Sequence, residues 1–159
     1  MEEFDQPRKL DALDRRILRT VQRQGNISQA DLAERVSTSP ASCWRRLKAL
    51  EDDGVLRETV RLVDPVKVGK GLDVICQVRM KSHAIDARGQ FEKFALNHDK
   101  IMDCYSMSGE WDYLLRVVVA DVKDYERFLM RVLLDHPSVA TAASHFALSQ
   151  TKYTTRLPV

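Results

Sequence analysis

The chain has 159 residues, of which 44% are apolar and 30% charged, and its formal net charge is +2. This apolar content is enough for one medium domain or two small ones and predicts a soluble globular protein. No run approaches the roughly eighteen apolar residues that span a bilayer. The acidic start Met1–Asp5 is unlike a signal peptide, so we expect a cytoplasmic protein.

Basic residues are concentrated in neither half of the chain. Residues 1–64 hold 12 basic and 12 acidic side chains, and the remainder holds 13 and 11. One local pattern is basic, since Arg45, Arg46 and Lys48 precede the acidic residues at 51–53. Any contact with DNA is therefore expected from one face rather than from overall charge.

Three short helices are predicted in residues 1–54. The first begins at Asp11 with apolar residues at helical spacing, and the second follows the capping residue Ser28. The third begins at Ser39, with proline at its first position. Two capped helices joined by a tight turn are typical of a helix-turn-helix, whose second helix enters the major groove of DNA.

Apolar spacing along the third helix separates an inner from an outer face. Cys43, Trp44, Leu47 and Leu50 form the predicted inner stripe, which favours core packing over base stacking for Trp44. The outer residues predicted to face base edges are Ala41, Ser42, Arg45 and Lys48, and those predicted to anchor phosphate are Ser39 and Arg46. The alternative is a solvated basic face on an ordinary helix.

Alternation after Gly54 predicts a strand over residues 55–63, within a linker spanning 55–70. The remainder, residues 71–159, shows a strand–helix–strand–strand–helix–strand order, with elements at 72–80, 84–97, 101–107, 113–120, 121–134 and 139–149. This α+β order is the ferredoxin-like arrangement, with two helices on one face of an antiparallel sheet. The other face is then left for a partner, which sheet-to-sheet pairing in a homodimer would provide.

Catalytic and metal-binding patterns are not found. The three cysteines, Cys43, Cys76 and Cys104, lie far apart in apolar contexts and are interpreted as reduced packing residues, with Cys104 more typical of a core than of a redox sensor. The four histidines lack a metal-ligand spacing. We expect no cofactor and no enzymatic activity, because two small domains leave no residues for a catalytic site.

Two motifs in this order resemble the Lrp/AsnC family of transcription regulators. The first runs from Asp11 through the helix pair to Leu50-Glu51 and Gly54, and the second is Ser108-Gly-Glu-Trp-Asp-Tyr-Leu-Leu115. The resemblance covers almost the whole chain. It implies a winged-helix-like DNA-binding domain joined to a ferredoxin-like sensor of amino acids. The ending Lys152–Pro158 also resembles a cysteine-responsive subgroup.

The resemblance further implies an effector pocket between protomers or dimers. Its implied lining residues are Ser106, Gly109, Glu110, Asp112, Val122, Tyr125, Phe146 and Ala147. The alternative at the Gly109 turn is a plain hairpin with a polar tip. The family implies a homodimer that assembles to a tetramer or octamer on promoter DNA, and the rival function is a nucleoid-type architectural protein with little sequence choice.

Overall fold

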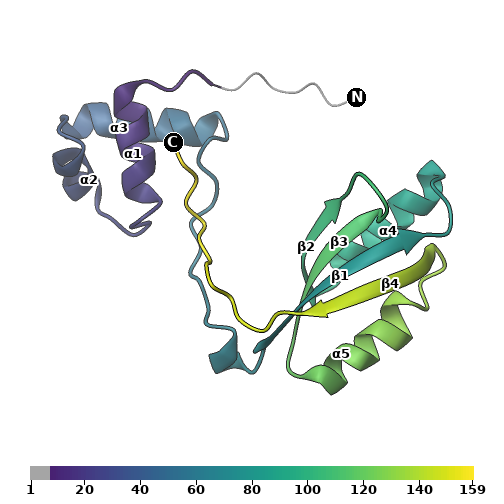
Figure 1. Ribbon diagram of the computed structural model, residues 1–159. Coiled ribbons are helices and arrows are strands. Elements are labelled where there is room, and N and C mark those ends of the chain that lie inside the picture. Colours follow the sequence, from purple (N-terminus) through teal and green to yellow (C-terminus); the bar gives the residue numbers. More distant parts are fainter. Residues whose placement is uncertain (1–7) are drawn as a thin grey trace. The chain divides into compact units, whose positions relative to one another are not determined.

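The computed structural model describes residues 8–159 and consists of two compact units (Figure 1). The first unit contains the chain up to Leu62 together with Lys152–Val159, and the second spans Val63–Thr151. This division differs from the expected domain limits, because residues 152–159 pack with the first unit. Met1–Asp5, from which we argued against a signal peptide, lies outside the described residues.

The first unit is built from α1 (Ala12–Val21), α2 (Gln29–Arg35) and α3 (Pro40–Asp52). The second and third helices begin at the predicted caps Ser28 and Ser39, and the first is capped by Asp11, its predicted start; each cap side chain accepts hydrogen bonds from backbone N–H groups of the first turn. The apolar stripes of the helices meet in one core, made by Ile17, Leu18, Leu32, Ala33, Val36, Cys43 and Leu50.

Two predictions for this unit are wrong. Trp44 is 52% exposed, because it lies about 100° around the helix from Cys43 and so falls outside the stripe that packs on α1 and α2. Residues 55–63 form no strand, since no second strand pairs with them in the described chain. Alternating apolar residues alone do not make a strand when the backbone finds no ladder partner.

A buried carboxylate joins α1 to α3. Asp14 is 1% exposed and accepts from the Asp11 N–H at 3.3 Å and from Arg46 Nη1 at 3.4 Å. Arg46 Nη1 also lies 2.8 Å from Asp11 Oδ2, and Arg8 Nη2 lies 4.0 Å from Asp14. A buried charge needs such partners, so this cluster fixes how α3 is rotated against α1.

The second unit is a four-stranded antiparallel sheet with two helices. Its strands are β1 (Leu72–Met80), β2 (Ile101–Ser106), β3 (Tyr113–Val119) and β4 (Val139–Phe146), in the order β2-β3-β1-β4. The helices are α4 (Ile85–Asn97) and α5 (Val122–Phe128), and α5 continues into a π-helical turn at Leu129–Leu133. A 3-10 turn at Val66–Val68 precedes β1. The predicted ferredoxin-like order is confirmed.

One face of the sheet carries the core, and the other has no cover among the described residues of this unit. Phe91 of α4 and Phe128 of α5 both pack on the alternate residues of β1 and β3 that are buried. The opposite face presents half-buried apolar residues, and Arg116 on it bonds Asp73 at 2.7 Å and Asp103 at 3.2 Å. This open face therefore combines half-buried apolar residues with a charged cluster.

We expect Arg46→Ala to lower the free energy of unfolding by about 1–3 kcal/mol, because the buried Asp14 carboxylate loses a charged partner. The matched control is Arg45→Ala on the exposed side of the same helix, which should change stability by less than about 0.5 kcal/mol. Urea unfolding followed by circular dichroism measures both. Equal losses in the two variants would contradict the structural role of Arg46.

Candidate functional site

The outer face of α3, defined here as Ala41, Trp44, Arg45 and Lys48, is exposed to solvent. These residues recur three or four positions apart and therefore share one side of the helix. Arg45 has no ion pair among residues 8–159. Its guanidinium is thus available for a ligand, as the sequence predicts.

The other predicted DNA-binding residues differ in the hydrogen bonds and ion pairs that they make within the chain. Ser39 caps α3, and its Oγ accepts from the Ser42 N–H at 3.2 Å, while Ser42 itself is half-buried. Lys48 pairs with Asp52 at 2.8 Å, and that carboxylate raises the pKa of the lysine. Arg46 is directed inward to α1, so its structural role is the larger one.

Trp44 is the residue of this face that sequence reasoning placed in the core. Its neighbours three and four positions away are the exposed Ala41 and Lys48, and this spacing was the signal that could have identified it. An exposed indole beside Arg45 adds an apolar, stacking-competent surface to the outer face of α3.

The turn between β2 and β3 is pinned to the end of β1 by Asp112. Its Oδ2 accepts the Met80 N–H at 2.7 Å, its Oδ1 lies 3.3 Å from His83 Nδ1, and its own N–H donates to Val78 at 2.9 Å. Gly109 adopts a φ of 113°, which side chains other than hydrogen rarely allow. Asp112 therefore shapes this turn.

Glu110 is the exposed acid of the same turn. Its Oε1 lies 2.6 Å from Arg79 Nη2, and the Arg79 guanidinium stacks 5.0 Å from the Trp111 ring centroid. The Nε of Arg79 is buried without a hydrogen-bond partner among the described residues. An anchored carboxylate and an incompletely satisfied guanidinium thus lie side by side at the tip of the sheet.

The remaining predicted effector residues form a second group, at the start of α5 and the end of β4. Tyr125 is buried, and its hydroxyl lies 2.6 Å from Ser144 Oγ. Burial raises the pKa of Tyr125, so the phenol stays neutral. Phe146 packs edge-on against this ring at 5.5 Å, the Ala147 N–H donates to Asp73 at 3.1 Å, and Val122 is exposed.

These two groups lie at opposite ends of β1. Asp112 bonds to Val78 and Ala147 bonds to Asp73, so the anchors are five residues apart, which is roughly 16 Å along a strand. Ser106 belongs with the Gly109 turn, since it pairs with Tyr113. The fold does not bring all eight predicted effector residues into one pocket of a single chain.

Two open cavities are lined by other residues. One, of about 490 Å³, lies between α1 and residues 152–159, and the other, of about 630 Å³, lies between α4 and β2. Cys104 lines the second and is exposed, whereas the sequence predicted a core position; the residue lies on the edge strand β2 and borders this open cavity. Desolvation and Glu92 raise the pKa of this thiol, which disfavours the thiolate.

Metal-binding and membrane-spanning features were sought in residues 8–159. No group of three histidine, cysteine or acidic residues there could hold a metal ion. Within the same residues, no helix is both long and apolar enough to cross a membrane.

Both units match known domains. Residues 10–57 match a winged helix-turn-helix DNA-binding domain, and residues 73–157 match the Lrp/AsnC ligand binding domain. The chain is 39% identical to the DNA-binding transcriptional activator DecR of Escherichia coli K12, over 94% of this chain and 99% of that protein.

Solved structures agree with this assignment. An AsnC family transcriptional regulator from Agrobacterium tumefaciens is 42% identical, with a TM-score of 0.89 over 94% of this chain and 97% of that one. A transcriptional regulator from Neisseria meningitidis, solved in complex with L-Met, is 37% identical, with a TM-score of 0.90 and the same coverage. The chain therefore belongs to the Lrp/AsnC family of transcriptional regulators, with a helix-turn-helix DNA-binding domain and a ligand-binding domain.

Proposed function

We propose that this regulator reads promoter DNA through the outer face of α3 and changes that binding when an amino acid occupies a site shared between protomers. The observation that carries the DNA half is the orientation of α3. Arg46 is held inward by Asp14, and this leaves Arg45 exposed and without an ion pair in residues 8–159. Arginine in this setting can grip guanine N7 and O6 with two hydrogen bonds.

The other residues of α3 receive supporting roles. Ala41, Ser42 and Lys48 face base edges beside Arg45, with Trp44 as an apolar neighbour. Ser39 lies at the helix start, where free backbone N–H groups favour a phosphate. Arg46 reaches phosphate only through the part of its guanidinium that Asp11 and Asp14 leave open.

The effector half is an amino acid bound near the Gly109 turn. The separation of the two groups of predicted lining residues favours a pocket completed by a second protomer, because roughly 16 Å is too far for one amino acid to bridge. Glu110 would receive the ammonium group of the ligand, and Arg79 lies in position for its carboxylate. The L-methionine in the Neisseria relative supports this ligand class.

We also propose that the assembly is a homodimer formed through the open face of the sheet, extending to a tetramer or octamer. The half-buried Ile75, Leu114 and Val118 lie on that face without cover in the single chain. A two-fold pair of α3 helices would meet half-sites about one helical turn of DNA apart or a multiple of it. This regulator acts in the cytoplasm and has no catalytic role.

Arg45→Ala should weaken binding to the specific promoter site by roughly 1–3 kcal/mol and relax base preference. Gel-shift titrations with the upstream DNA of its own gene, against bulk competitor DNA, measure both effects. If the wild type itself shows no preference over bulk DNA at physiological salt, the architectural alternative holds. Unchanged affinity and preference in Arg45→Ala would instead show that this residue does not read bases.

Glu110→Gln should abolish the stabilisation of the chain by its amino-acid effector, because the ammonium group loses its carboxylate acceptor. Thermal unfolding with each of the twenty amino acids first identifies the effector, which stabilises by about 2.7 kcal/mol at a hundredfold excess over its Kd. Glu126→Gln, an exposed acid on α5, is the matched control. If the effector stabilised the Glu110→Gln variant as much as the wild type, the plain-hairpin interpretation of this turn would hold instead.

A further inference from the structure

The chain passes between its two units twice. It enters the second unit at Val63 and leaves it after Thr151, and residues 152–159 return to the first unit. The segment Lys152–Val159, called here the strap, is thus a second covalent connection between the ligand-binding unit and the DNA-binding unit. Its docking site lies wholly within the first unit.

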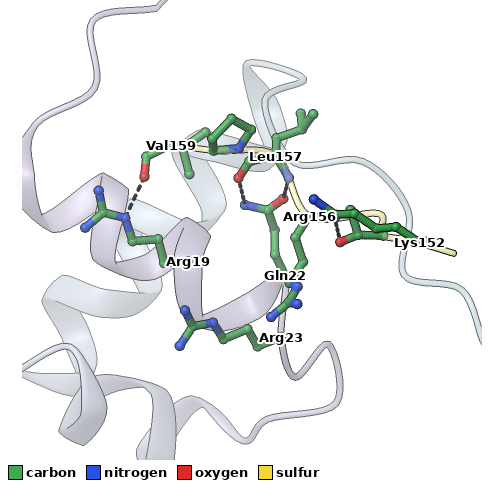
Figure 2. A pocket seen from close by; sticks show the side chains of 9 residues that line it. Arg19, Gln22, Arg23, Lys152, Arg156, Leu157 and Val159 are labelled. Atoms are coloured by element: carbon green, nitrogen blue, oxygen red, sulfur yellow. Dashed lines mark hydrogen bonds between the residues drawn. The ribbon is translucent and has the colours of Figure 1, made fainter.

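The strap is held on α1 through its backbone. The Gln22 side chain makes a reciprocal pair with Leu157, since its Nε2 donates to the Leu157 carbonyl at 3.3 Å and its Oε1 accepts the Leu157 N–H at 2.6 Å. Arg19 Nε donates to the Val159 carbonyl at 2.5 Å. Figure 2 shows both side chains reaching from α1 to the strap.

Apolar contact is confined to the end of the strap. Val159 is half-buried and packs against the core shared by α1, α2 and α3, whereas the Leu157 side chain is 71% exposed. Pro158, between them, restricts φ and has no N–H to leave unsatisfied. The strap is therefore bound by two backbone positions and one side chain, which is a small attachment.

Charge works against this attachment. Arg19, Arg23, Lys152 and Arg156 line the cavity between α1 and the strap, and none forms an ion pair within residues 8–159. Like charges that line one cavity repel one another, and salt screens that repulsion.

Helix α1 contacts both the strap and α3. Gln22 directly follows α1, Asp14 lies on α1, and the Asp14 carboxylate binds Arg46 of α3, next to Arg45. A displacement of α1 is thereby passed to α3 through a buried ion pair and through the packing of Ile17 and Leu18 in the shared core.

We infer that the strap is a coupling element: docked on Gln22 and Arg19, it transmits changes in the ligand-binding unit through α1 to the outer face of α3. The transmission part of this inference rests on the proposed effector response. Docking itself does not, and the two parts are measured separately. A released strap leaves DNA binding intact and removes its dependence on effector.

The first measurement is hydrogen–deuterium exchange of the C-terminal peptide in the full chain. The wild type should protect the Leu157 amide, more strongly as salt increases, and Gln22→Ala should lose that protection. Gln24→Ala is the matched control, because its side chain does not line the strap cavity. Wild-type exchange as fast as in Gln22→Ala would overturn docking and the inference with it.

The second measurement is promoter affinity with and without the amino acid that stabilises the wild type. Coupling between sites usually changes affinity about 5–150-fold. Gln22→Ala should keep the effector-free affinity within about twofold and reduce the effector-induced change to near none, and a chain shortened after Thr151 should behave alike. A full response in both variants would overturn the inference. If no amino acid alters the wild type, the proposed function fails, and the exchange experiment still decides whether the strap docks.

Discussion

The buried carboxylate of Asp14 is the constraint on which the DNA-binding unit depends. At 1% exposure it requires charged partners, and Arg46 supplies one of them from α3. That pairing removes Arg46 from free solvent and sets the rotation of α3 around its axis. The exposed position of Arg45, one residue earlier, is a consequence of it. A contact that looks purely structural therefore decides which arginine of the pair is exposed to solvent.

Sequence periodicity predicted most of the fold because amphipathic patterns act locally. Caps at Asp11, Ser28 and Ser39 marked the helix starts, and alternation gave the bounds of β1 as Leu72–Met80. What sequence reasoning missed concerns partners. Whether residues 55–63 become a strand depends on a neighbouring strand, and the inward ion pair of Arg46 depends on a carboxylate 32 residues earlier. Neither fact is contained in a local pattern.

The candidate effector site was less accessible to sequence reasoning. The resemblance to the Lrp/AsnC family supplies the positions of eight effector-lining residues but not the distances between them. Taken together, those positions suggest a single pocket. Hydrogen bonds to β1 instead anchor Asp112 at Val78 and Ala147 at Asp73. The Tyr125 hydroxyl contacts Ser144, whereas Arg79 reaches from β1 to pair with Glu110 of the Gly109 turn. Sequence reasoning did not single out Arg79, because a charged residue that alternates along a strand gives no sign of the partner it meets across a turn.

Transmission between the units needs an element that can be both attached and released. The strap is held through backbone atoms of Leu157 and Val159, which any sequence possesses. The contact therefore depends on the Gln22 side chain, whereas the exposed Leu157 side chain takes little part in it. Repulsion among the four cations that line this cavity works against the docked state, so the attachment depends on the bonds that Gln22 and Arg19 make to the strap backbone.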